Sequence, residues 1–384
     1  MHLANNIYLT DDLRAIADQA ITFCQNEVAP HAEEWEEAGD IPRDVLTKMG
    51  DLGMFSLRIP QEHGGLGMGP IASCVFAEAI GRGSTVGGFD ATVTVHTDMA
   101  SPHLIHKGSE EQLAKYLPGV MSGDVLTAIA VTEPDAGSDV AGLRTTAVRD
   151  GEGWRLNGTK MFITNGGTAE LVIVAARTNP DVKYGISMFL LDKGTPGLSV
   201  SRKLNKHGWL SSNTVELVLD DVYLPPEALL GEEHKGFYEI MKNFQNERLV
   251  LTAVACGAAQ TAIDMTLEYT QNRKAFDGVI YDKGAVRQRM AMNQAKLDAA
   301  RAGMYHAAWM YENGEDATKE VSAAKAFGCE AVNEIMYDCT QFHGGMGCMR
   351  ETAVERMYRD ARINTIGGGA TEVMLEEVAK RSYI

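Results

Sequence analysis

Apolar and polar residues recur along the first third of the chain with the spacing of an α-helix. Within residues 11–21, apolar residues return every three or four positions, and breakers such as Pro30 and the pair Gly64–Gly65 interrupt the pattern. This periodicity predicts a helical domain over residues 1–124.

The pattern changes to short β-rich stretches in residues 125–234, which predicts a central β-domain. These stretches lie at residues 154–157, 171–174, 186–191 and 215–219. Asp150–Gly151 and Asn157–Gly158 have the composition of tight turns between strands. Residues 235–384 return to long helical periodicity, interrupted only by glycines near positions 344–345 and 367–369. The expected fold is therefore α+β and mostly α, in the order helices, strands, helices.

Composition excludes several classes of protein. The net charge of −17, from 35 basic and 52 acidic residues, argues against a nucleic-acid-binding protein, because phosphate binding needs a basic surface. The six cysteines show no metal-ligand spacing, and we expect reduced thiols, mostly in the core. The longest apolar run, residues 249–263, is shorter than the roughly 20 residues of a membrane span, so we expect a buried helix there. The N-terminus lacks the pattern of a leader, which favours a cytoplasmic location.

Four segments have compositions that suit a binding site. They are Ala130–Asp139 (AVTEPDAGSD), Lys160–Gly166 (KMFITNG), Asn272–Phe276 (NRKAF) and Gln341–Gly347 (QFHGGMG). Taken singly, the first is a turn and the third a solvated basic pair near a helix end. The fourth is not a dinucleotide-binding fingerprint, since no third glycine follows at the needed spacing. His343 and Cys348 lack further ligands for a metal, so we interpret His343 as structural and expect no metal site.

Together, in this order and over essentially the whole chain, the four segments resemble the acyl-CoA dehydrogenase family. The resemblance implies a C-terminal domain of the four-helix-bundle type, FAD as cofactor and an acyl-CoA thioester as substrate, as in fatty-acid β-oxidation. It also implies electron-transfer flavoprotein as electron acceptor, and a homotetramer in which FAD is shared across a subunit interface.

The resemblance also assigns roles to individual residues. It implies cofactor binding by Ile129, Val131, Thr132, Phe162, Thr164, Arg273, Phe276, Gln341, Gly344, Gly345 and Glu372. It implies substrate binding by Ser138, Arg248 and Gly367. Phe162 stands where the family usually has tryptophan, so it keeps an aromatic face and lacks the indole N–H. The planar fork of Arg273 suits a pyrophosphate.

The family's usual catalytic glutamate is missing. Most members place it two residues after the position of Ile366, where this chain has Gly368. The long-chain and isovaleryl-CoA branches carry the base on the long helix instead, and the matching residue is Glu247. A surface ion pair with Arg248 is the alternative for that glutamate. Burial among apolar neighbours would raise its pKa toward that of a working base. Gly368 keeps its backbone N–H, which can serve as half of an oxyanion site.

Helix geometry bears on how the site is assembled. Glu247 and Arg273 are 26 positions apart, which corresponds to about 39 Å on an unbroken helix. That exceeds the reach of one FAD, so both could serve one flavin only from different subunits.

The leading hypothesis is an α,β-desaturation of medium- or long-chain or branched acyl-CoA, with Glu247 taking the α-proton and FAD the β-hydride. The glycines at 367–369 remove side-chain bulk, which favours long or branched chains. Three alternatives stay open: a dehydrogenase specific for branched isovaleryl- or citronellyl-like chains, an acyl-CoA oxidase, and a non-catalytic acyl-CoA-binding relative.

Overall fold

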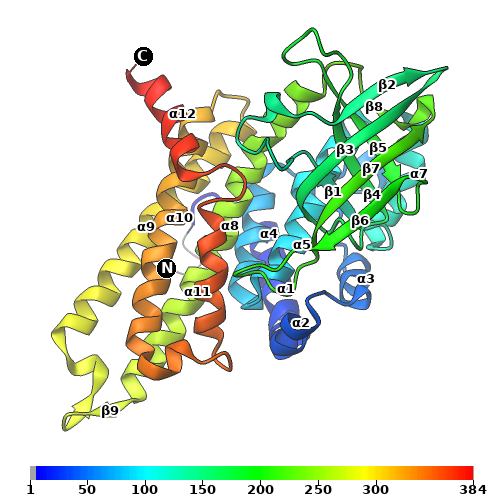
Figure 1. Cartoon of the computed structure of the whole chain (residues 1–384). Helices are drawn as coiled ribbons and strands as arrows, with labels where there is room; N and C mark the ends of the chain where they lie inside the picture. Colours follow the sequence, from blue (N-terminus) through cyan, green and yellow to red (C-terminus); the bar gives the residue numbers. More distant parts are fainter. Residues whose placement is uncertain (1–5, 384) are drawn as a thin grey trace.

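Residues 6–383 are described by the computed structural model, in which a sheet lies at one side of the molecule and the long C-terminal helices at the other (Figure 1). The N-terminal helices are α1 (Asp11–Glu27), α2 (Ala32–Ala38), α3 (Arg43–Asp51), α4 (Pro70–Ser84), α5 (Gly87–Thr94), α6 (Ser101–Lys107) and α7 (Glu110–Ser122). A π-helix, Val95–Ala100, joins α5 to α6. Local sequence explains several starts: Thr10 caps α1, Pro70 is the first residue of α4, and Ser109 forms a capping box with Gln112 at α7.

Eight strands form one sheet, seen at the upper right of Figure 1. They are β1 (Thr127–Ala130), β2 (Thr146–Asp150), β3 (Gly153–Thr164), β4 (Leu171–Arg177), β5 (Ile186–Asp192), β6 (Leu198–Lys203), β7 (Thr214–Leu224) and β8 (Leu229–Leu230). The order is β6-β7-β3-β2-β4-β5-β8, and β1 pairs with β4 in parallel. All four β-rich stretches of the sequence lie in these strands.

One predicted turn is wrong. Asp150–Gly151 does turn the chain between β2 and β3, with Gly151 at φ +61°, but Asn157–Gly158 lies inside β3. The register between β3 and β7 shifts there, so the pair belongs to a β-bulge. A Cβ on Gly158 would collide with Thr145 Oγ1, so the glycine serves a close approach of two segments.

The C-terminal part consists of α8 (Gly236–Asn272), α9 (Gly284–Glu312), α10 (Thr318–His343), α11 (Ala353–Asn364) and α12 (Thr371–Tyr383). The expectation that only the two glycine-rich segments interrupt these helices is wrong. After α8 a small antiparallel pair forms, β9 (Lys274–Ala275) with β10 (Gly278–Val279). Phe276 and Asp277, at φ +52° and +60°, make its two-residue turn. Asp277–Gly278 has the composition of a turn, but the two flanking strands are only two residues long, so hydrophobic periodicity does not reveal the hairpin.

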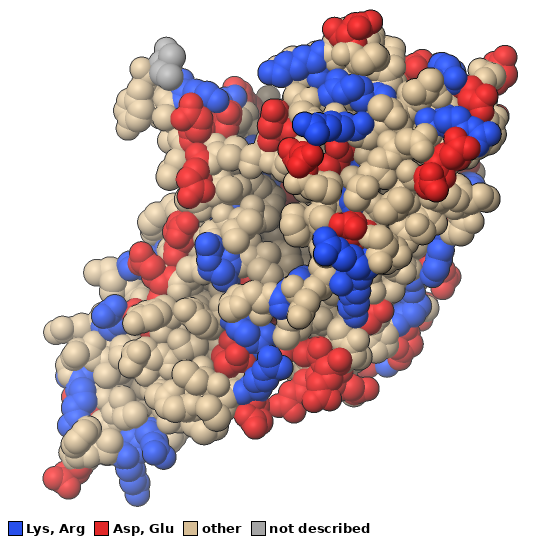
Figure 2. All heavy atoms as spheres, viewed as in Figure 1, with Lys and Arg blue, Asp and Glu red and all other residues tan. Residues whose placement is uncertain are grey.

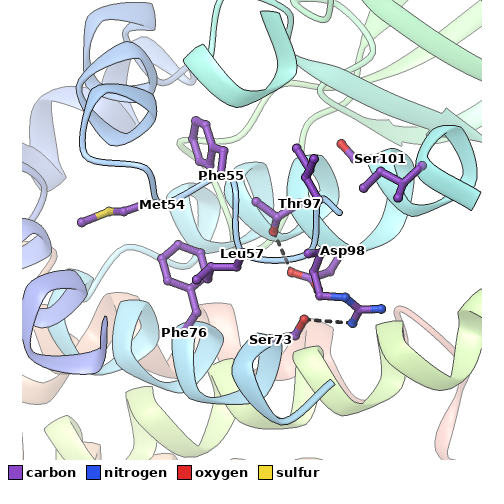
Figure 3. Close-up of a pocket in the computed structure, with 11 residues that line it drawn as sticks. Met54, Phe55, Leu57, Ser73, Phe76, Thr97, Asp98 and Ser101 are labelled. Atoms are coloured by element: carbon purple, nitrogen blue, oxygen red, sulfur yellow. Dashed lines mark hydrogen bonds between the residues drawn. The ribbon is translucent and has the colours of Figure 1, made fainter. Parts of the chain in front are cut away.

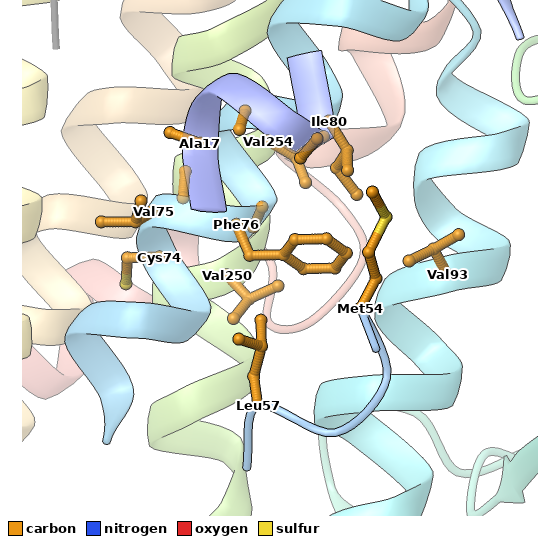
Figure 4. Close-up of a cluster of buried hydrophobic side chains, with 14 of the residues drawn as sticks. Ala17, Met54, Leu57, Cys74, Val75, Phe76, Ile80, Val93, Val250 and Val254 are labelled. Atoms are coloured by element: carbon orange, nitrogen blue, oxygen red, sulfur yellow. The ribbon is translucent and has the colours of Figure 1, made fainter. Parts of the chain in front are cut away.

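Helix α8 is shared by two hydrophobic cores. Its Val250 and Val254 pack with Phe76 and Ile80 of α4 among the N-terminal helices (Figure 4). Further along, its apolar residues from Ala255 to Ile263 pack with α9, α10 and α11. By length and composition α8 could cross a membrane, but 78% of its most apolar stretch is buried inside the protein. It is therefore a core helix, as its apolar run predicts.

Candidate functional site

Glu247 lies on the buried face of α8, with only 6% of its surface exposed. Its Oε1 accepts a hydrogen bond of 3.0 Å from Asn243 Nδ2, one helical turn earlier. Burial raises the pKa of Glu247 to about 8, although the bond from Asn243 and the charge of Arg248 act to lower it. No ion pair joins Glu247 to Arg248 within residues 6–383, so the alternative of a surface pair is not what the structure shows.

The glycines at 367–369 lie against the same part of α8. A Cβ on Gly368 would overlap the side chain of Leu251, the residue one turn after Glu247, and a Cβ on Gly369 would lie 3.6 Å from Arg248 Nε. Gly368 and Gly369 have φ of +63° and +109°. These glycines therefore permit a backbone conformation and a close approach to α8, in addition to removing side-chain bulk.

An apolar wall completes this region. Val95 and Met99 of the π-helix form a small buried cluster with Leu251, and Ile129 of β1 and Trp209 of the β6–β7 loop pack against it. Residues from four separate parts of the chain thus surround the position next to Glu247 and Gly368.

The loop after β1 is fixed by a buried ion pair. Lys160 Nζ, completely buried, donates to Glu133 Oε1 at 2.7 Å and to the Val131 carbonyl at 3.1 Å. The Thr132 carbonyl accepts from Met161 N at 2.9 Å, so the loop and β3 lie side by side. Sequence reasoning did not assign a role to Lys160, because a single lysine in a strand gives no sign of a buried partner.

Phe162 and Thr164 follow on β3 at a second bulge. The register with β7 shifts between Lys160 and Ile163, and Phe162 has φ +61° with 66% of its surface exposed. A large residue with positive φ at a bulge is uncommon and is often found at functional sites. The structure thus turns an aromatic side chain outward beside the half-buried Thr132 and Thr164, whose hydroxyls have no hydrogen-bond partner in the described part of the chain.

A second group of predicted residues lies at the C-terminal end of α8. Arg273 is the residue after the last turn of α8, and Phe276 is 86% exposed. The end of α10 lies beside it, since the rings of Tyr269 and His343 stack with centroids 4.5 Å apart. Gln341 lies in the last turn of α10, and Gly344 and Gly345 come directly after the helix; all three are exposed. A Cβ on Gly344 or Gly345 would meet nothing within 4 Å, so packing within this chain does not require glycine there.

The remaining predicted residues are more scattered. Ser138 is on an exposed loop, Glu372 is exposed in the first turn of α12, and Gly367 is half-buried. His343 is buried and hydrogen-bonds the Cys339 carbonyl at 2.9 Å, in agreement with a structural role. Five cysteines are buried, Cys348 is exposed, and no group of three potential metal ligands occurs among the described residues.

Two polar residues near Glu247 were missed by sequence reasoning. Asn243 bonds the carboxylate, and the fully buried Lys325 of α10 donates from Nζ to the Gly369 carbonyl. Each residue lies in a helix and contacts an atom of another turn or another element, so only the folded structure reveals its partner.

Comparison with known proteins agrees with this arrangement. The chain matches three domains of acyl-CoA dehydrogenase: the N-terminal domain at residues 10–124, the middle domain at 128–222 and the C-terminal domain at 234–383. It is 39% identical over 363 residues to the long-chain specific acyl-CoA dehydrogenase of Sus scrofa mitochondria, covering 93% of this chain and 83% of that protein. It is 36% identical to the caffeyl-CoA reductase-Etf complex subunit CarC of Acetobacterium woodii, covering 96% and 97% of the two chains.

Solved structures give the same result. A putative acyl-CoA dehydrogenase from Mycobacterium smegmatis superposes with a TM-score of 0.95 at 38% identity, covering 98% of this chain and 99% of that one. The FAD complex of PigA superposes with a TM-score of 0.94 at 28% identity, covering 98% of both chains. The chain therefore belongs to the acyl-CoA dehydrogenase family, whose members are oxidoreductases with FAD as cofactor.

Proposed function

We propose that this protein desaturates medium- or long-chain or branched acyl-CoA thioesters between Cα and Cβ, with Glu247 as the catalytic base. The observation that carries the proposal is the contact between Gly368 and Leu251, one turn from Glu247. Because of this contact, the loop position where the family usually has its base and the helix position of Glu247 border one site. In this chain the helix position bears the carboxylate and the loop position bears only hydrogen.

The residues around the site fit the flavin part of FAD. An outward aromatic ring at Phe162 and the free hydroxyls of Thr132 and Thr164 offer a stacking face and hydrogen bonds, with Ile129, Val131 and Glu372 as further proposed contacts. When bound, FAD supplies the acceptor for the β-hydrogen and its electron pair.

The chain's own residues supply acid–base chemistry and charge stabilisation. The Glu247 carboxylate removes the α-proton, and its pKa of about 8 suits a base that works near neutral pH. The backbone N–H of Gly368 donates to the thioester oxygen as enolate charge develops there. Arg248 and Gly367 border the substrate, and Ser138 on its exposed loop contacts the CoA part. The apolar wall of Val95, Met99 and Leu251 excludes water from the reacting carbons.

The apolar wall and the relative named long-chain specific support a long or branched acyl chain. The relative named as part of an Etf complex supports electron-transfer flavoprotein as the electron acceptor. We place the reaction in the cytoplasm.

We also propose a homotetramer in which Arg273, Phe276, Gln341, Gly344 and Gly345 of one subunit bind the FAD of another. On the face seen in Figure 2, the C-terminal helices show large uncharged areas between scattered charged side chains. Exposed large apolar residues on α10 and just after it include Phe327, Tyr337, Met346 and Met349.

The test is anaerobic bleaching of the yellow holoenzyme by octanoyl-, palmitoyl- and isovaleryl-CoA. We expect Glu247→Gln to retain FAD and to bleach about 10²–10⁴-fold more slowly, because the base is removed. Glu268→Gln, which changes an exposed carboxylate on the same helix, should bleach like wild type.

The possible results distinguish the proposed dehydrogenase from an oxidase and from an acyl-CoA-binding protein. Retention of colour with all three thioesters would support an acyl-CoA-binding protein, and fast reoxidation by O₂ after bleaching would support an oxidase. Unchanged bleaching in Glu247→Gln would exclude Glu247 as the base.

A further inference from the structure

Two asparagine side chains of α8, Asn243 and Asn246, hold the π-helix between α5 and α6. Asn243 Nδ2 donates to the backbone carbonyls of Asp98 at 3.1 Å and of Met99 at 3.2 Å. A π-helix has an irregular hydrogen-bonding pattern and often occurs next to a functional site. Asn243 is 9% exposed, so the amide and the carbonyls interact away from bulk water.

The same amide nitrogen also contacts the proposed base. Asn243 Nδ2 lies 3.0 Å from Glu247 Oε1, and the two residues are four positions apart on α8. One NH₂ group therefore faces three oxygens, two of which belong to fixed backbone. A side chain held in this way has little freedom to rotate, and the carboxylate that it bonds is limited to the same direction.

We propose that Asn243 is a positioning residue that holds the carboxylate of Glu247 in the direction needed to reach the substrate's α-carbon, using the carbonyls of the π-helix as its anchor. This inference rests on the function proposed above. It assigns to Asn243 a contact with the base and no contact with substrate or cofactor.

Charge explains why this contact also affects proton transfer. A hydrogen bond donated to a carboxylate favours its ionised form, so Asn243 opposes the rise that burial causes in the pKa of Glu247. Arg248 on α8 acts in the same direction, and Asp98 of the π-helix acts against it. The other nearby cations have partners: Lys325 of α10 bonds the Gly369 carbonyl, and Arg58 bonds Asn246.

Asn246 provides a matched control on the same helix. Its Nδ2 donates to Asp98 Oδ1 at 3.0 Å, and its Oδ1 accepts from Arg58 Nη1 at 2.9 Å. Figure 3 shows Asp98 with Thr97 on the π-helix and Ser73, which also accepts from Arg58, on α4. Asn246 is thus a buried amide bound to the same π-helix, without a bond to Glu247.

The experiment measures the pH dependence of anaerobic bleaching in the holoenzyme, using the best of the three thioesters. We expect Asn243→Leu to retain FAD and to shift the acid limb of the profile upward by about one pH unit, which slows bleaching about tenfold on that limb. Asn243→Gln keeps an NH₂ donor on a longer side chain and should recover part of the shift. Asn246→Leu should lower the melting temperature and leave the acid limb in place.

Infrared titration of the Glu247 carboxyl, taken as the difference from Glu247→Gln, provides a measurement that does not require turnover. It keeps the proposal about Asn243 testable if no thioester bleaches the wild type. That result would overturn the proposed function and not the contact proposed for Asn243. An unchanged carboxyl titration and acid limb in both Asn243 variants would overturn the proposal. Equal shifts in the Asn243→Leu and Asn246→Leu variants would also overturn it, because the effect would then come through the π-helix as a whole.

Discussion

At the scale of single residues, the proposed base Glu247 has to meet two requirements that act against each other. Its carboxyl is removed from water, which disfavours ionisation, yet a base must be ionised to accept a proton. The bond from Asn243 and the charge of Arg248 partly offset burial, so that the pKa of Glu247 stays at about 8. A base with a pKa close to the working pH combines an accessible ionised form with a strong affinity for the proton.

The raised pKa of Glu247 predicts a specific pH dependence of stability. Below its ordinary value of 4.5, the carboxyl is protonated in both the folded and the unfolded chain. Between 4.5 and about 8 it is protonated only in the folded chain, so each rise in pH favours unfolding, until the pH exceeds the folded-state pKa. Burial of this acid therefore destabilises the fold most at high pH.

We expect Glu247→Gln, which is neutral at every pH, to be more stable than wild type above pH 8, by at most about 5 kcal/mol. The difference should shrink as the pH falls and vanish near pH 4. Urea unfolding of both holoenzymes between pH 4 and 9 measures it. A difference that does not vary with pH would contradict the raised pKa.

At this scale, the sequence does not predict which atom a buried polar residue contacts in the fold. The resemblance directs attention to the helix position of Glu247, and the role of this residue as the base stays a prediction. The contacts of Lys160, Asn243 and Lys325 could not be predicted, since each residue bonds a carbonyl or carboxylate of a segment that is distant in the sequence. A sequence pattern records the polarity of such a residue and not the atom that satisfies it.

At the scale of elements, hydrophobic periodicity gave the helices and the main strands. Periodicity did not predict two local features of the backbone. At Gly158 the chain forms a bulge and not the predicted turn. At Phe276 it forms a hairpin where helical periodicity was expected to continue. The π-helix at Val95–Ala100 also has no periodic signature, because it is held by the side chains of Asn243 and Asn246 from α8, which is distant in the sequence. These three features have irregular backbone, and two of them border the proposed site or the second group of cofactor residues.

Close packing of α4 against α8 depends on two glycines. A Cβ on Gly257 would collide with the Glu78 carbonyl, and a Cβ on Gly81 would collide with the Val254 carbonyl. Backbone atoms cannot swing aside as a side chain can, so the helices would have to separate. Because α8 carries Glu247, the spacing of these helices also affects the site.

We predict that Gly257→Ala lowers the free energy of unfolding by about 1–3 kcal/mol through overpacking, with a loss of FAD at lower temperature than in wild type. Gly303→Ala on α9 is the matched control, since a Cβ there meets nothing within 4 Å. Alanine at that position should stabilise the protein by about 0.5–1 kcal/mol, because it restricts the unfolded chain and favours helix. Thermal unfolding followed by flavin fluorescence measures both. Equal effects of the two substitutions would show that the α4–α8 contact is not tight.

At the scale of the whole molecule, the proposed site residues form two groups along α8, one around Glu247 in the first half of the helix and one at its C-terminal end. Glu247 and Gly368 lie with the apolar wall, and Arg273 lies with Phe276 and the end of α10. Helix α8 is continuous from Gly236 to Asn272. On such an unbroken helix, Glu247 and Arg273 are too far apart to serve one FAD from a single chain. In the proposed arrangement, one chain presents half of each of two cofactor sites, and a second copy completes both.

Mixing two inactive variants tests this arrangement directly. In a pair of Glu247→Gln and Arg273→Glu subunits, one shared site would carry both substitutions and the other site neither. Random pairing of equal amounts makes half of the pairs mixed, so we expect about a quarter of the wild-type sites to bleach, although each variant alone is inactive or lacks FAD. If each FAD were bound within a single chain, every site in the mixture would carry one substitution and no activity would return. Co-expression with two different affinity tags isolates the mixed pairs, in which about half of the sites should then bleach and bind FAD. FAD in half of the sites of these mixed pairs without any bleaching would indicate that Glu247 and Arg273 serve one site from the same chain, which the continuous length of α8 argues against.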